Sequence, residues 1–264
     1  MNTEPEPGTR NPEPRTVARR TFKLTITYDG TRFIGWQRQA RGESIQGLIE
    51  EALARFEGAP VTVHGAGRTD AGVHALGQVA SVQLTCGHAP AELLRGINAT
   101  LPHDIRIMRV AEAAADFHAR FSARSKTYRY AIRNAAVVSP FERSYVWQVP
   151  APLDLSAMRE AATALIGTHD FAAFRGTGTE TKDTVRTITR SEIEMTGDTL
   201  LSYEVSGNGF LRHMVRAIVG TLVDIGRGGR PADSMPSLIA SASRAEAGAT
   251  APPYGLFLVA VDYD

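Results

Sequence analysis

Hydrophobic and polar positions alternate in short runs through the first 115 residues, and these runs frame two segments with helical spacing. Period-two alternation predicts half-buried strands, whereas apolar residues at intervals of three and four predict amphipathic helices. Ser44 and Pro90 stand where the two helices would begin. The predicted strands are 21–28, 61–64, 78–84 and 105–110, and the predicted helices are 44–56 and 90–97.

The second half of the chain repeats this order of elements without repeating its sequence. A Gly-Asp turn at 197–198 joins two of its strands into a hairpin. A short strand at 145–148 and a helix at 233–240 are additions, and 176–183 has the composition of a mobile loop. The main predicted strands are 126–132, 185–194, 199–206 and 256–262, and the main predicted helices are 154–166 and 210–225.

Strand, helix, strand, strand, helix, strand is the split βαβ order of ferredoxin-like folds. We therefore predict an α+β protein of two ferredoxin-like halves, 21–115 and 116–264, whose antiparallel sheets join edge to edge around a central cleft. Residues 1–20 are rich in Pro, Glu and Arg, and we expect them to form a disordered tail.

Composition excludes several classes of protein. The chain has 264 residues, 43% of them hydrophobic and 22% charged, which is ordinary for a soluble protein. The apolar run at 214–226 is too short and too charged to span a bilayer, and the first twenty residues lack the apolar core of a signal peptide. Cys86 is the single cysteine, so no disulfide forms within the chain. We expect a cytoplasmic protein.

Positive charge is clustered although the net charge is only +1. Five cations fall between residues 120 and 133, a run without a single acid, and two arginines recur one helical turn apart further on. A solvated face and a phosphate-binding face both fit such a pattern. The residues are Arg120, Arg124, Lys126, Arg129, Arg133, Arg212 and Arg216.

The densest chemistry lies at 65–75, which reads Gly-Ala-Gly-Arg-Thr-Asp-Ala-Gly-Val-His-Ala. Gly65, Gly67 and Gly72 permit tight bends around Arg68 and Asp70. A turn in which the aspartate caps its own backbone and a reactive loop are both consistent with this stretch.

Residues 126–133 alternate aromatic and basic side chains. Lys126 and Tyr128 fall on one face of the predicted strand, and Arg129 and Arg133 fall on the other. Residues 206–209 lead into a predicted helix whose free amides favour an anion. Because Arg212 and Arg216 are adjacent on that helix and repel, we expect at least one to face a carboxylate or phosphate.

Several familiar sites are absent from the sequence. The dinucleotide fingerprint fails, and neither a phosphate-binding loop nor a serine-hydrolase elbow occurs. His169-Asp170 is the one pair typical of metal-dependent phosphohydrolases, but the histidines are scattered singly, so we expect no metal. A lone aspartate that is ionised at neutral pH can still act as a nucleophile or as an electrostatic group.

The segment 67–74, Gly-Arg-Thr-Asp-Ala-Gly-Val-His, resembles the signature of the tRNA pseudouridine synthase A family. Further blocks resemble the family in the expected order, so the resemblance covers about 21–264. These blocks are Tyr-Asp-Gly at 28–30, Gly-Trp-Gln at 35–37, Ser-Ile-Gln-Gly at 44–47, Phe-His-Ala-Arg-Phe-Ser-Ala at 117–123, Lys-Thr-Tyr-Arg-Tyr at 126–130, Val-Arg-Thr-Ile at 185–188 and Gly-Phe-Leu-Arg-His-Met-Val-Arg at 209–216.

The resemblance implies an enzyme that isomerises uridine to pseudouridine at positions 38, 39 and 40 of the tRNA anticodon stem-loop, without metal or organic cofactor. It implies a homodimer, and it makes the central cleft an RNA-binding cleft. Asp70 matches the catalytic aspartate, Arg216 its basic partner, Tyr128 the tyrosine that stacks on the extruded uracil, and Arg68 the arginine against the RNA. Attack on the base, attack on the sugar and removal of a ribose proton all remain open for the aspartate. The expected phosphate contacts are Arg212, His213, Arg120, Arg124 and Lys126.

Two other functions compete with this one. A non-catalytic tRNA-binding or RNA-folding protein would use the same basic groove, and a phosphohydrolase would use His169 and Asp170. The synthase hypothesis also explains the glycines of the loop, because a side chain at Gly67 or Gly72 would obstruct the approach of RNA. Gly72→Val is accordingly expected to lower turnover more than stability.

Overall fold

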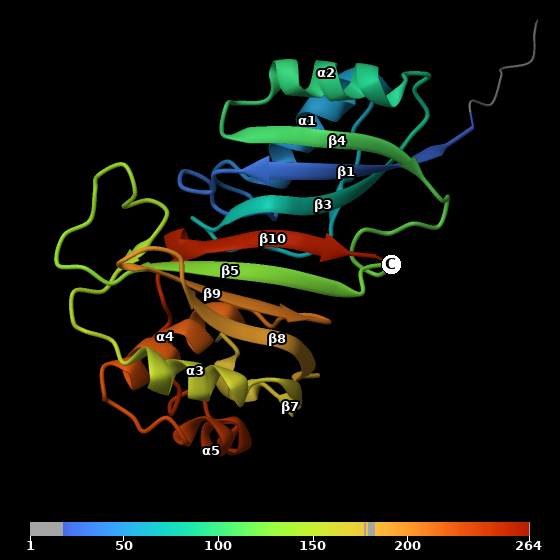
Figure 1. Ribbon diagram of the computed structural model, residues 1–264. Helices are drawn as coiled ribbons and strands as arrows, with labels where there is room; N and C mark the ends of the chain where they lie inside the picture. The colour runs from blue at the N-terminus through green and yellow to red at the C-terminus, as the bar shows by residue number, and fades with distance from the viewer. Residues whose placement is uncertain (1–17, 177, 179–182, 264) are drawn as a thin grey trace, which may run out of the picture.

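The computed structural model describes residues 18–176, 178 and 183–263. Most of the predicted tail and of the predicted mobile loop therefore lies outside the described residues. The strands form one sheet in the order β4-β1-β3-β10-β5-β9-β8-β7, with β2 paired to β3 and β6 paired to β5 (Figure 1). The strands are β1 Arg20–Tyr28, β2 His64–Gly65, β3 His74–Leu84, β4 Ile105–Ala113, β5 Ser125–Arg133, β6 Trp147–Gln148, β7 Gly167–Asp170, β8 Val185–Met195, β9 Leu200–Gly207 and β10 Leu256–Asp262.

Five α-helices accompany the sheet in the described part of the chain. The predicted cap is present at the first of them, where the Ser44 side chain accepts a hydrogen bond from the Gly47 amide, and Gly58 ends that helix with a φ of 74°. Asp154 caps the third helix by accepting from the amides of Ser156 and Ala157. The helices are α1 Ile45–Glu57, α2 Pro90–Thr100, α3 Leu155–Thr163, α4 Met214–Gly226 and α5 Ser234–Ser241.

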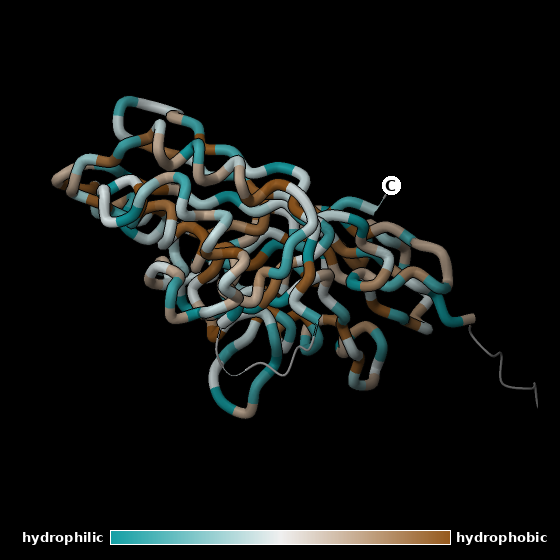
Figure 2. Tube along the Cα trace, turned by 90° about the horizontal axis from the view of Figure 1, so that it is seen from below, coloured by the Kyte–Doolittle hydropathy of each residue, from teal (hydrophilic) through white to brown (hydrophobic). Residues whose placement is uncertain are grey.

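The two parts of the chain join through a parallel pairing of β3 with β10, in which Phe257 lies opposite His74 and Leu258 opposite Ala75. This confirms the expectation of an edge-to-edge junction. Nearly all other pairings are antiparallel, and the α+β class is confirmed. Hydrophobic stretches run through the middle of the molecule, and the projecting loops carry hydrophilic ones (Figure 2).

Strand β5 has two distinct faces, as its alternation predicts. Tyr128, Tyr130 and Ile132 are buried in the main core together with residues of α4, and we call this the helix-side face. Arg129 and Ala131 point the other way and line a hollow of about 480 Å³, and we call this the open face. The sheet therefore separates one face that is packed by helices from one that is reached by solvent.

Two predicted boundaries are wrong for identifiable reasons. The predicted strand 61–64 is reduced to β2, because the Val63 amide donates to Glu50 and the Val63 carbonyl accepts from Gln46, both on α1. The helix predicted from residue 210 begins only at Met214, because His213 has a left-handed backbone with a φ of 61°. The anion site expected at 206–209 therefore does not adjoin the first turn of a helix.

Candidate active site

The loop that carries Asp70 is fixed by hydrogen bonds from three other elements. The Trp36 amide donates to the Thr69 carbonyl at 3.0 Å, and the Tyr28 hydroxyl lies 2.8 Å from the Thr69 hydroxyl. Gln78 Nε2 donates to the Gly67 carbonyl at 2.9 Å. Since Thr69 is buried, the residue before Asp70 acts as an anchor, and the carboxylate is presented from a rigid backbone.

The glycines of this region have different tasks. A Cβ at Gly65 would lie 2.5 Å from the Trp36 indole, and one at Gly35 would lie 2.6 Å from the Thr69 carbonyl. Gly72 has a φ of +76° and faces Pro253, so the backbone itself requires glycine there. Gly67 differs, since a Cβ there would lie 3.6 Å from Lys126 Cε and 3.8 Å from the Tyr128 hydroxyl.

This corrects the expectation for Gly72. Any side chain at that position strains the turn, so Gly72→Val is expected to lower stability as well as turnover. Gly67 is the glycine that borders Lys126 and Tyr128.

Asp70 and Arg216 form an ion pair across 146 positions of sequence. Arg216 Nη1 donates to Asp70 Oδ2 at 2.9 Å, and Arg216 Nε donates to the Ala251 carbonyl at 2.8 Å. The Ala251 amide returns a hydrogen bond to the Arg216 carbonyl at 3.0 Å. The prediction that Arg212 or Arg216 faces a carboxylate is thus confirmed for Arg216, and its guanidinium is held from two sides.

Asp70 uses one carboxylate oxygen for these contacts. His213 Nε2 lies 3.5 Å from the same Oδ2, so arginine and histidine converge on one atom. Oδ1 accepts no hydrogen bond within the described part of the chain, and the side chain is 28% exposed. The aspartate is therefore held by one oxygen while the other stays available to a ligand.

His213 was expected to contact phosphate, and the structure places it beside Asp70. Its left-handed backbone turns the ring back from the start of α4, and Gly176 packs against that ring. Burial lowers the pKa of His213, and the nearby arginines act in the same direction against the attraction of Asp70. The imidazole is consequently neutral at neutral pH.

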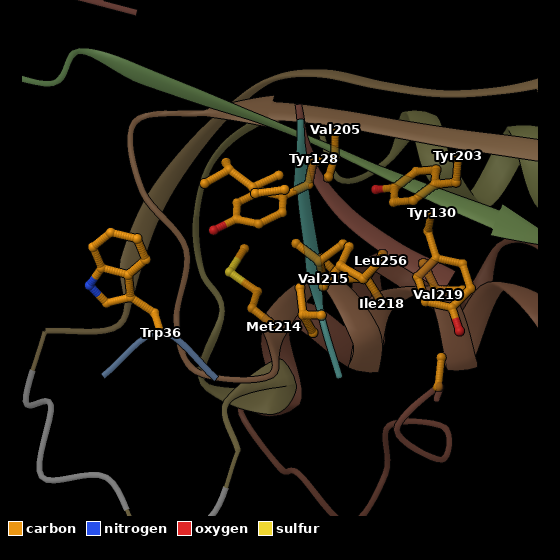
Figure 3. Packing of buried hydrophobic residues seen from close by; sticks show 14 of the residues in the cluster. Trp36, Tyr128, Tyr130, Tyr203, Val205, Met214, Val215, Ile218, Val219 and Leu256 are labelled. Atoms are coloured by element: carbon orange, nitrogen blue, oxygen red, sulfur yellow. The ribbon is translucent and has the colours of Figure 1, made fainter. Parts of the chain in front are cut away.

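Tyr128 lies on the helix-side face of β5 and is 7% exposed. Its ring meets Phe210 edge to face at a centroid distance of 5.0 Å. Figure 3 shows Tyr128 within the cluster of buried hydrophobic residues. Burial raises the pKa of Tyr128 well above its usual range, and the charges of Tyr28 and Asp70 add to this effect. The phenol is therefore neutral and provides a flat surface near Gly67.

The predicted RNA contacts divide into two groups. Lys126 is half-buried beside Gly67, and burial, followed by repulsion from Arg120 and Arg186, lowers the pKa of its ammonium. Arg68, Arg120, Arg124 and Arg212 are exposed. Arg129 and Arg133 lie on the open face instead, where they pair with Glu204 at 3.3 Å and Glu142 at 2.7 Å.

The remaining candidates from the sequence do not form a site. His169 Nε2 lies 3.0 Å from the Ile166 carbonyl, and Asp170 accepts from the Ala172 amide, so both stabilise their own turn. Across the described ranges, no three His, Cys, Asp or Glu side chains are grouped to hold a metal. In the same ranges, helices long and apolar enough to span a membrane are absent.

Sequence reasoning missed the residues that support the loop. Trp36, Gly35 and Thr69 fix the backbone around Asp70, and Ala251 orients Arg216. The Gly-Trp-Gln block at 35–37 was visible as a signal, but its contact with Thr69 depends on the tertiary fold. The carbonyl of Ala251 carries no sequence signal at all.

The fold and the site together define an α+β protein in which arginine holds the carboxylate of a glycine-rich loop, close to a buried tyrosine and several exposed cations. Comparison with known proteins agrees with this class. The model of the tRNA pseudouridine synthase family matches residues 24–122 and 161–264.

Two relatives are named tRNA pseudouridine synthase A. The protein of Myxococcus xanthus is 47% identical over 247 residues, which cover 92% of this chain and 91% of that protein. The protein of Geotalea uraniireducens (strain Rf4) is 46% identical over 244 residues, which cover 92% of this chain and 100% of that protein. The chain belongs to the tRNA pseudouridine synthase family.

Proposed function

We propose that this protein isomerises uridine to pseudouridine in tRNA, at positions 38, 39 and 40 of the anticodon stem-loop, with Asp70 as the catalytic aspartate. The observation that carries the proposal is the geometry of that carboxylate. Arg216 and His213 converge on Oδ2, and Oδ1 makes no hydrogen bond to any described residue. One oxygen is thus free to attack the base or the sugar, or to accept a ribose proton.

Arg216 has two tasks in this reaction. It orients Asp70, and it places a positive charge beside the carboxylate. The Nε contact to Ala251 fixes the plane of the guanidinium, so the aspartate keeps its direction while the base detaches from the ribose and turns. The reaction is intramolecular and needs neither metal nor organic cofactor.

Tyr128 is the surface on which the extruded uracil stacks. A paired base must leave the helix to reach Asp70, and a buried aromatic ring next to Gly67 compensates the lost stacking. The raised pKa of Tyr128 keeps its proton on the phenol, which disfavours a step that needs the phenolate. Stacking is therefore the role that its environment supports best.

Exposed and half-buried cations bind the RNA backbone in a central cleft between the two parts of the chain. Arg68 is exposed, and it makes no ion pair with a described residue, which suits an arginine that lies against the nucleotide beside the target. Lys126, Arg120, Arg124 and Arg212 contact phosphates. The enzyme is cytoplasmic and acts as a homodimer.

The finer fold assignment is two ferredoxin-like halves, bounded at about residue 115. The strand order supports it, because β1 lies between β4 and β3 while β2 pairs with β3, and the order β10-β5-β9-β8 repeats this arrangement.

Asp70→Asn tests the proposed function. The variant keeps the shape of the side chain and a hydrogen-bond acceptor for Arg216, but it loses the charge and the nucleophile. Release of tritium from uracil C5 of labelled tRNA should fall by at least about 10³-fold. The affinity for tRNA should stay within about twofold, because a phosphate-binding surface dominates it.

The matched control is Asp198→Asn, which changes an exposed aspartate in the hairpin between β8 and β9. It should leave both turnover and affinity unchanged. Retained tritium release in Asp70→Asn would refute the assignment of the aspartate. Tight tRNA binding by a wild-type protein that forms no pseudouridine would establish the non-catalytic binder instead.

A further inference from the structure

Three aromatic rings form an exposed stack at the edge of the Asp70 region. The ring centroids of His64 and His118 are 4.9 Å apart with an interplanar angle of 32°, and those of His118 and Phe121 are 4.3 Å apart at 35°. Phe121 is 77% exposed. The aromatic stack (His64, His118 and Phe121) therefore ends in a ring whose surface is open to solvent.

The aromatic stack rests on a fixed backbone. His118 Nδ1 accepts hydrogen bonds from the amides of Arg120 at 3.1 Å and Phe121 at 3.4 Å, which set the orientation of the ring. The Ala119 amide donates to the Ser81 hydroxyl at 3.0 Å, and the Tyr263 hydroxyl donates to the Ala119 carbonyl at 2.8 Å. Ser81 of β3 and Tyr263, which follows β10, thus fix the turn that carries His118 and Phe121 before any ligand arrives.

The aromatic stack is continuous with the proposed active site. His64 opens β2, which leads directly into the glycine loop, and Gly67 of that loop borders Lys126. Arg120 lies 5.7 Å from the centroid of the Phe121 ring and repels the ammonium of Lys126. Exposed rings and uncompensated cations consequently occur together on this surface.

Exposed rings beside cations are the chemistry that binds single-stranded nucleic acid, because every base has a face that stacks and every nucleotide carries a phosphate. A single exposed ring does not by itself indicate a binding site for nucleic acid. Phe141 is an example, since it is 89% exposed but contacts no other aromatic ring of the described chain. Three stacked rings next to Arg120 and Lys126 are a different arrangement.

We infer that the aromatic stack receives an unpaired base of the RNA substrate, at a nucleotide other than the uridine that enters the Asp70 site. This inference rests on the proposed function and adds a second base-binding position to it. Arg120 would contact the phosphate of the stacked nucleotide, and Phe121 would lie against its base.

Phe121→Ala and Phe121→Trp test the inference in the full chain with unmodified tRNA. Loss of the ring should raise the Kd for tRNA about 10-fold, in line with the usual strength of base stacking. The single-turnover rate at saturating tRNA should stay within about twofold. The salt dependence of the Kd should not change, because no charge is removed. Tryptophan should restore the wild-type Kd.

Tryptophan also provides a direct readout. Fluorescence of Phe121→Trp should be quenched when tRNA binds, and Phe141→Trp, the matched variant at the other exposed phenylalanine, should not respond. Phe141→Ala should leave the Kd unchanged. A merely structural role for Phe121 would not produce a tRNA-dependent change in fluorescence.

A Kd for Phe121→Ala within twofold of wild type would overturn the inference. So would equal effects at Phe121 and Phe141, or a loss found only in the single-turnover rate. Since the Kd is measured without turnover, these results are separate from the test of Asp70. A protein that forms no pseudouridine but loses tRNA affinity in Phe121→Ala would refute the proposed function and retain the stacking site.

Discussion

The two faces of β5 differ in whether their basic side chains are paired with carboxylates. On the open face, Arg129 pairs with Glu204, and Arg190 of β8 bridges Glu204 and Glu192. On the helix-side face, Lys126 is half-buried, and no described carboxylate pairs with it. Two neighbouring cations of a single basic run thus differ in their pairing, because Arg129 has a carboxylate partner and Lys126 has none among the described residues.

This difference bears on function because an uncompensated cation in a partly buried position is unfavourable by itself. A cation kept there gains when an anion arrives from outside. An arginine that already has a carboxylate gains little from a phosphate, since it would exchange one partner for another. We therefore propose that RNA binds on the helix-side face, and that the ion pairs of the open face contribute to the internal stability of the sheet.

Among the variants that compare the two faces, Arg216→Lys should produce the largest effect, because the guanidinium of Arg216 holds the carboxylate of Asp70. Lysine keeps the charge but cannot hold Asp70 and the Ala251 carbonyl at once. We expect kcat to fall about 10²-fold, the scale of losing one preorganised donor, with tRNA affinity nearly unchanged. Tritium release under single-turnover conditions measures this.

Arg129→Lys is the matched control on the open face. It alters an arginine that also contacts a carboxylate, but one that is remote from Asp70, and turnover should change less than twofold. Equal losses in the two variants would remove the functional distinction between the faces.

The sequence predicted the alternation that creates these two faces, and it predicted that at least one of Arg212 and Arg216 faces a carboxylate or phosphate. Both follow from local periodicity and like-charge repulsion. The partner of Arg129 could not be predicted, because Glu204 lies 75 positions away and the pairing depends on the register of β5 with β9.

The same limit applies to the Asp70 site. The glycine-rich loop was evident, but the left-handed backbone that turns His213 toward Asp70 has no sequence signature for a residue other than glycine. The tasks of the glycines also depended on their tertiary neighbours. Gly67 and Gly72 are equivalent in the sequence, and they differ in the structure by the left-handed φ of Gly72 and by their contacts with Tyr128 and Pro253.

His74→Gln tests the open face through its pH dependence. Phe257 lies opposite His74 across the β3–β10 junction, and the histidine is buried, with Nδ1 accepting from the Gly30 amide and Nε2 near the carbonyls of Ser144 and Tyr254. Burial lowers its pKa. The unfolded chain therefore binds more protons, so this contribution to stability is complete above about pH 6.5 and is lost as the pH falls below it.

Urea unfolding between pH 8 and pH 5.5 measures this loss. One such group contributes at most about 1.4 kcal/mol per pH unit to the slope. The partly buried His118 and His213 have lowered pKa values too and act in the same direction, so the quantity to compare is the difference in slope between wild type and His74→Gln. The slope should become shallower in the variant.

Lys126→Met should have the smallest effect, a change in the salt dependence of tRNA binding, and it compares two neighbouring residues on opposite faces of β5. If Lys126 neutralises a phosphate, the variant releases about one counterion fewer than wild type when tRNA binds. The slope of the logarithm of the tRNA binding constant against the logarithm of the salt concentration should then fall in magnitude by roughly 0.7 to 0.9. Arg129→Met, only three residues along the same strand, should leave that slope unchanged because the Arg129 guanidinium is already paired with Glu204.

Filter binding of tRNA between 50 and 200 mM salt resolves the two outcomes, since the loss of affinity from Lys126→Met should shrink as salt rises. A reduced slope in Arg129→Met would mean that the ion pairs of the open face open to receive RNA, and the two faces would then be one binding surface.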